Sequence, residues 1–180
     1  MIIAKEKKKT NIAEYILYMW QVEDLIRAYE FDIEKIEKNV ISQFKQPQKI
    51  KTEIKEWYKN LIKIMKQTNI YEKGHLQFVK DIINDLNKLH LSLIKSPDEI
   101  KYIEQYNWAL PNIRELQTKS KGSVSNDIET CFIGLYALFL LRLQKKEISI
   151  ETKEAMCTFS NLLSLLSVKY KKNEIRTKDI

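Results

Sequence analysis

The chain contains very few of the two residues that interrupt regular structure. Among its 180 residues there are 3 Gly and 3 Pro, and Lys, Glu, Leu, Ile and Gln are abundant. Gly and Pro are the strongest breakers of helices, whereas the abundant residues favour helix. No segment shows the period of two that a strand would require. The sequence therefore predicts an all-α fold, and 3 Gly are too few for a Gly-rich phosphate loop.

Cysteines and long apolar runs are scarce as well. Cys131 and Cys157 are the only two cysteines, and both lie in apolar helical segments. They match neither a disulfide framework nor a metal-binding spacing. The longest apolar run, 131–141, is much shorter than the roughly 20 residues that cross a bilayer. The first residues lack the apolar region of a signal peptide. We therefore expect a cytoplasmic protein with reduced thiols.

The positive charge comes almost entirely from lysine. The net charge is +7, but only four residues are Arg, and the Lys residues are spread along every expected helix with Glu nearby. Phosphate binding needs a concentrated basic patch. The pattern is more typical of solvated helix faces, so nucleic-acid binding through Lys is only a weaker alternative.

The helical periodicity predicts a single-domain bundle of about seven helices over residues 1–180. A flexible start is expected at 1–9, a loop at 118–125 and a flexible tail at 173–180. The expected helices cover residues 10–30, 33–44, 48–67, a segment ending near 95, 97–111, 126–145 and 150–171. Helix 126–145 is apolar around its middle, which predicts a central position surrounded by other helices.

Several residues mark where these helices begin and end. Asp32 is expected to cap the second helix, and Ser96 followed by Pro97 is expected to start the fifth. Pro111 should end or kink that fifth helix. Gly74 lies either within the first turns of the fourth helix or at a break before it, and the pattern leaves both open.

Glu23 occupies an unusual position for a carboxylate. At 100° per residue it falls in the middle of the apolar arc of the first helix. A buried charge needs a partner, and Arg27, one turn later, and Arg142, beside an apolar run, are the candidates. We expect a structural ion pair, with a small-ligand pocket as the alternative. The residues of this candidate polar cluster are Glu23, Arg27, Arg142, Tyr18, Trp20 and Tyr136.

The two histidines, His75 and His90, lie on one stripe of the expected fourth helix. Glu72 and His75 form one E-x-x-H, the unit that di-metal bundles use in pairs. A second E-x-x-H is absent, and His90 is about 22 Å further along a helix. We therefore expect two hydrogen-bonded core or boundary histidines, no metal, no cofactor and no catalytic residues.

Three segments resemble a known family. They are IAEYILYMWQVEDLIRA at 12–28, GHLQFVKDIINDL at 74–86 and IETCFIGLYALFLLRLQKKEIS at 128–149. They are similar to an uncharacterised family of all-helical proteins of about this length from Bacteroidetes-type bacteria. The resemblance implies a bacterial cytoplasmic protein, and it supplies no catalytic residues because that family has no assigned activity.

Our leading hypothesis is a non-enzymatic protein that acts through protein–protein interaction or self-association, as in a homodimer. The alternative is a ligand binder or enzyme with its pocket around Glu23.

Overall fold

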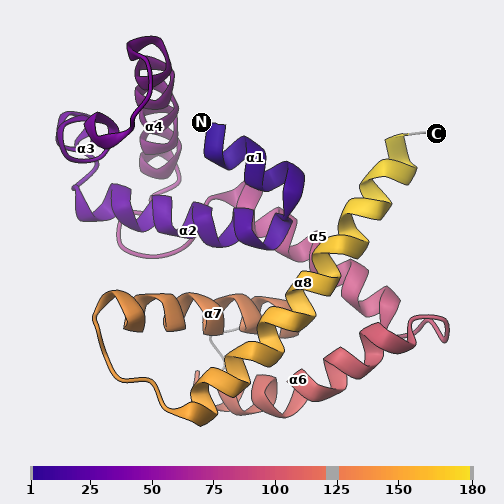
Figure 1. Cartoon of the computed structure of the whole chain (residues 1–180). Coiled ribbons are helices and arrows are strands. Elements are labelled where there is room, and N and C mark those ends of the chain that lie inside the picture. Colours follow the sequence, from indigo (N-terminus) through magenta and orange to yellow (C-terminus); the bar gives the residue numbers. More distant parts are fainter. Residues whose placement is uncertain (1, 121–125, 179–180) are drawn as a thin grey trace. The chain divides into compact units, whose positions relative to one another are not determined.

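A computed structural model describes residues 2–120 and 126–178, with side chains described up to Asn173. Within these ranges the chain forms eight α-helices and one short 3-10 helix, and no strand is present (Figure 1). The predicted all-α fold is confirmed. The expected loop at 118–125 falls mostly on residues 121–125, which lie outside the described ranges.

The chain forms two compact units, which we describe separately. The N-terminal unit comprises Met1–Thr10 and Glu14–Lys80, and the C-terminal unit comprises Asn11–Ala13 and Asp81–Ile180. The helices follow one another in the order α1 (Ile2–Thr10), α2 (Ile12–Ala28), α3 (Ile33–Asn39), the 3-10 helix η1 (Ile41–Gln43), α4 (Gln48–Gln67), α5 (Gln77–Leu93), α6 (Ile100–Lys119), α7 (Asp127–Leu143) and α8 (Ile150–Lys178).

In the N-terminal unit, α4 packs against α3 and η1. Asp32 caps α3 as predicted, because its carboxylate accepts from the amides of Glu34 at 2.9 Å and Lys35 at 3.2 Å. The expected helix 33–44 divides into α3 and η1. Helix α4 has the limits that its apolar stripe predicts, and its inner face buries large apolar side chains: Ile54, Tyr58, Leu61, Ile62 and Met65.

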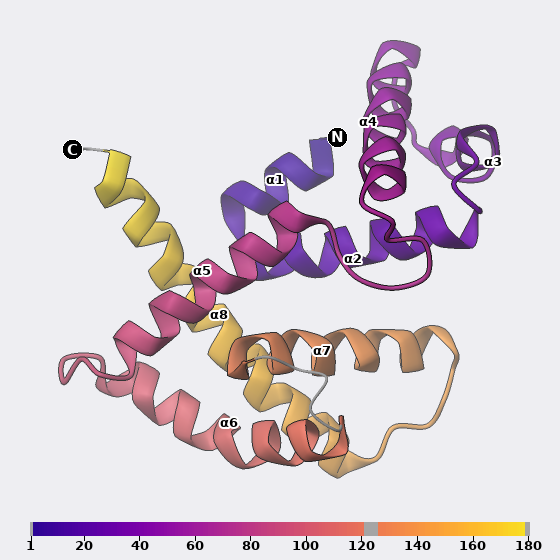
Figure 2. The ribbon, with the colours of Figure 1, turned by 180° about the vertical axis from the view of Figure 1, so that it is seen from behind.

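In the C-terminal unit, α8 packs against both α6 and α7, which also contact each other (Figure 2). Gly134 of α7 permits a close approach to α8. A Cβ at Gly134 would lie 2.7 Å from the ring of Phe159, which is fully buried. The buried residues of α7 are Ile128, Thr130, Cys131, Phe132, Gly134 and Leu138. Its last turn is less enclosed than the apolar pattern predicts, since Leu143 is 64% exposed.

Three other segments differ from the expectations, and the position of Gly74 is decided between the two alternatives. The expected flexible start 1–9 contains helix α1, with Ala4 buried, and the expected flexible tail begins within α8. Gly74 lies before α5 with a φ of 92°, so it marks a break. Helix α6 begins only at Ile100, because Ser96 instead forms a turn by accepting from the amide of Glu99 at 3.1 Å.

Pro111 does not end α6, so that part of the prediction is wrong. The helix is continuous from Ile100 to Lys119. A proline removes the hydrogen bond to the carbonyl four residues earlier. Here that carbonyl belongs to Asn107, and both Asn107 and Pro111 are exposed. Water can therefore replace the missing donor, which keeps the cost of the proline low.

Candidate functional site

Glu23 is buried, as its place on the apolar arc of α2 predicts. Its exposed fraction is 0%. One carboxylate oxygen accepts from the backbone amide of Leu76 at 3.0 Å. The other lies 2.6 Å from Nδ1 of His75. An ionised carboxylate can only accept, so Nδ1 carries the hydrogen in that state. Both oxygens of Glu23 are thus engaged by the segment that precedes α5.

The predicted ion pair between Glu23 and an arginine is wrong. Arg27 bonds to the Asp24 carboxylate at 2.8 Å and to the carbonyl oxygen of Gly74. Arg142 is an exposed residue of α7 in the C-terminal unit. The partner of Glu23 is His75, which lies in the non-helical connection before α5.

Glu23 and Arg27 together fasten the connection between α4 and α5 to α2. They lie one turn apart, and each bonds to this connection 47 to 53 residues away in sequence. Leu76 directly precedes α5, and its carbonyl accepts from the amides of Val79 and Lys80 in the first turn. A negative charge at this end complements the partial positive charge of a helix N-terminus. We call these contacts of Glu23 and Arg27 with residues 74–76 the clasp, and their geometry is that of a structural contact between α2 and the connection before α5.

His75 contributes an aromatic contact and a partly exposed ring. It stacks on Trp20 with ring centroids 4.2 Å apart and planes 13° from parallel. Its side chain is 28% exposed, and Nε2 bonds to no residue in the described part of the chain. A neutral imidazole whose Nδ1 hydrogen points to Glu23 has its acceptor at Nε2.

The other residues of the predicted cluster are divided between the two units. Trp20 belongs to the N-terminal unit and joins Glu23 through His75. Tyr18, in the same unit, is half-buried, and burial followed by the charge of Tyr58 raises the pKa of its hydroxyl. Tyr136 belongs to the C-terminal unit and stacks on Phe139 with centroids 5.9 Å apart.

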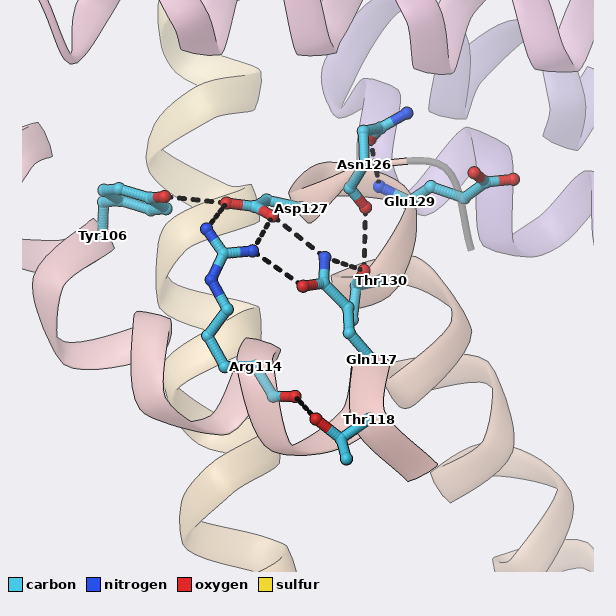
Figure 3. A network of polar contacts seen from close by, with 8 residues as sticks. All are labelled: Tyr106, Arg114, Gln117, Thr118, Asn126, Asp127, Glu129 and Thr130. Carbon is cyan, nitrogen blue, oxygen red and sulfur yellow. Dashed lines mark hydrogen bonds and ion pairs between the residues drawn. The ribbon is translucent and has the colours of Figure 1, made fainter. Parts of the chain in front are cut away.

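A second polar network, centred on Asp127, was missed by the sequence analysis (Figure 3). Its carboxylate accepts from the hydroxyl of Tyr106 at 2.7 Å and the amide of Gln117 at 3.0 Å. Arg114 binds both carboxylate oxygens, at 2.8 and 3.3 Å. Asn126 caps the N-terminus of α7, the helix that begins with Asp127, by accepting from the amide of Glu129 at 2.8 Å. The network ties α6 to the first turn of α7.

The ionisation of this network follows from its contacts. Burial opposes ionisation of Asp127, but the hydrogen bonds from Tyr106, Gln117 and Arg114 outweigh it and lower the pKa of the carboxyl. Burial, followed by the bond to Asp127, raises the pKa of Tyr106 to about 12. Asp127 is therefore charged and Tyr106 neutral near neutral pH. The scarcity of arginine is the sequence signal that could have indicated Arg114, because it is one of only four arginines in the chain.

His90 lies beside this network and is hydrogen-bonded, as expected for a core histidine. Its Nδ1 is 2.8 Å from the hydroxyl of Tyr102, and its ring meets that of Tyr106 edge-on at 4.7 Å. Burial lowers the pKa of His90, and the charge of Asp127 opposes that effect. In residues 2–120 and 126–173, no group of three or more His, Cys, Asp or Glu side chains is arranged to hold a metal ion.

Comparison with known proteins identifies the family and no activity. None of the helices in the described ranges is long and apolar enough to cross a membrane. No curated protein and no solved structure matches the chain. One family matches residues 1–177, nearly the entire sequence. The chain therefore belongs to the family described as a domain of unknown function, DUF4924.

Proposed function

We propose that this protein acts without catalysis, by binding another protein or a second copy of itself through the outer side of α6. We define the α6 face by Ile100, Trp108 and Pro111. Ile100 is 65% exposed and Trp108 is 63% exposed, and Pro111 is exposed as well. At 100° per residue these three positions fall within about 80° of one another on the helix.

The exposed Trp108 is the observation that carries the proposal. Tryptophan is enriched among the residues that dominate binding energy at protein interfaces, because it buries a large rigid surface. Trp20, by contrast, is only 2% exposed and serves the core. At 100° per residue, the exposed Glu104 and Glu115 fall within the arc of the α6 face, and the exposed Lys101 lies at its edge. The face therefore combines an exposed aromatic side chain with charged groups that a partner of opposite charge could pair with.

The alternatives that the sequence left open have less support. A ligand pocket at Glu23 requires the carboxylate to reach solvent, but its exposed fraction is 0% and both oxygens are bonded. Nucleic-acid binding through Lys has less support because the lysines are spread along the helices. Its test is the dependence on salt, since the affinity for phosphate groups should fall steeply as the salt concentration rises.

The proposal also includes a bacterial cytoplasmic setting. It is supported by the family resemblance described above and by two free cysteines, Cys131 and Cys157. Free thiols persist in reducing compartments.

The test compares Trp108→Ser with Ile150→Ser as a matched control. Ile150 is 68% exposed and lies outside the α6 face. Sedimentation velocity over a range of concentrations measures self-association, and acrylamide quenching of tryptophan fluorescence reports whether Trp108 becomes covered. Affinity purification with each variant as bait covers a different partner protein. We expect association by the wild type and Ile150→Ser that Trp108→Ser loses. Equal behaviour of all three proteins in every assay would refute the proposal.

A further inference from the structure

The N-terminal unit contains an open groove beside α4. Its volume is about 400 Å³. The residues that line this α4 groove are Phe31, Ile33, Lys59, Ile62, Lys63, Lys66 and Gln67. The apolar side chains form its floor, since Ile62 is only 7% exposed and both Phe31 and Ile33 are partly buried. The three lysines are exposed and belong to one side of α4.

Positive charge along this side of α4 is left uncompensated only at the groove. Lys55 bonds to Glu34 at 3.0 Å and to Glu37 at 2.5 Å. Lys59 bonds to Glu56 at 2.7 Å. The next two lysines, Lys63 and Lys66, have no carboxylate partner in the part of the chain that the structure describes. The groove therefore presents two ammonium groups that are available to an external anion.

Phe31, the aromatic residue of the floor, is held in an unusual backbone conformation. Glu30 and Phe31 have positive φ values of 55° and 59°. Bulky residues rarely adopt this region, and such outliers persist where the surrounding structure imposes them. The Phe31 ring meets Tyr71 edge-on at 5.4 Å, and the ammonium group of Lys66 lies 5.9 Å from its centroid. The Phe31 ring and the Lys66 ammonium group thus already lie together without a ligand.

We propose that the α4 groove binds a free medium-chain aliphatic carboxylate. The apolar floor would receive the alkyl chain, and Lys63 and Lys66 would bind the carboxylate. A volume of about 400 Å³ lies within the usual range of small-molecule sites, roughly 300–1,000 Å³. Ammonium groups on flexible stems suit such a head group because they contact it as point charges. The site is independent of the α6 face.

Binding of decanoate, followed by isothermal titration calorimetry below its critical micelle concentration, tests the inference. The series acetate, hexanoate, octanoate and decanoate tests the floor. Affinity should rise along the series by up to about fourfold per methylene, the limit set by complete burial of each group. The double variant Lys63→Glu/Lys66→Glu should weaken decanoate binding about tenfold, because it removes two exposed ion pairs.

The double variant Lys45→Glu/Lys49→Glu is the matched control. It changes the net charge by the same amount, but neither residue lines the groove, and both are exposed. It should leave decanoate affinity within about twofold of the wild type. A second test pair, Lys63→Gln/Lys66→Gln, removes the cations without adding repulsion and should give an intermediate loss.

Four outcomes would overturn the inference. They are no saturable decanoate binding, equal loss in the test and control variants, equal binding of acetate and decanoate, and binding confined to anionic phospholipid vesicles or to an acidic peptide. Chemical-shift changes in wild-type protein that map to Phe31, Ile33 and Ile62 would support it.

Discussion

Glu23→Ala should destabilise the N-terminal unit strongly. The substitution removes a fully buried carboxylate that bonds to the Leu76 amide and to His75. Each hydrogen bond to a charged group contributes about 1.5–3 kcal/mol, and the substitution removes two of them. We therefore expect the free energy of unfolding to fall by roughly 3–6 kcal/mol. Glu23→Gln keeps an acceptor of nearly the same shape, so it should cost less, about 1–3 kcal/mol.

Urea unfolding followed by tryptophan fluorescence measures this loss, since Trp20 stacks on the affected ring of His75. A double-mutant cycle with His75→Ala should give a coupling energy of about 0.5–3 kcal/mol. Hydrogen exchange provides a local readout, because the Leu76 amide loses its acceptor in Glu23→Ala and should exchange faster. Glu53→Gln is the control, since Glu53 is an exposed residue of α4. A loss in Glu23→Ala no larger than in this control, or a coupling energy near zero, would refute the clasp between α2 and the start of α5.

Three further predictions concern the C-terminal unit. Gly134→Ala should lower the unfolding free energy by about 1–3 kcal/mol, measured by thermal denaturation, because the new Cβ would lie 2.7 Å from the buried Phe159 ring; unchanged stability would show that α7 and α8 separate easily. Asp127 has a lowered pKa in the folded state, so its stabilising contribution is present above the ordinary carboxyl pKa of about 4 and is lost as the pH falls through the folded value. The stability difference between wild type and Asp127→Asn should therefore shrink between pH 6 and pH 3, and a constant difference would contradict this ionisation. Native protein should react with one equivalent of a thiol reagent, at the exposed Cys157. It should react with two equivalents only after denaturation, because Cys131 is buried and burial raises the pKa of its thiol. The variant Cys157→Ser should lose the reaction of the native protein.

The composition and periodicity of the sequence were sufficient for the helical fold. The limits of α4 and the cap at Asp32 follow from local patterns, because an amphipathic stripe and a capping side chain act within a few residues of each other. The burial of Glu23 also followed from its position on the helical wheel, since one face of an amphipathic helix is buried wherever it packs.

The partners of the buried polar groups depended on the tertiary structure. His75 is 52 residues from Glu23 in sequence, and it reaches the carboxylate from the non-helical connection that contains Gly74 and precedes α5. The network at Asp127 likewise joins two helices whose polar residues look, in sequence, like solvated helix ends. Which donor meets which acceptor is set by the path of the chain between the helices, and the helical pattern carries no information about that path.

The tertiary structure also decided at which residue α6 begins and that this helix continues past Pro111. Ser96 and Pro97 have the sequence of a helix start, yet the helix begins at Ile100, where Glu99 forms an ion pair with Lys169 of α8. Pro111 has the sequence of a helix end, yet its exposed side allows the helix to continue. Local preferences of this kind amount to a few kcal/mol at most, so packing against another helix and access to water override them. The sequence therefore determined the type of structure, whereas the packing decided the helix limits and the polar contacts.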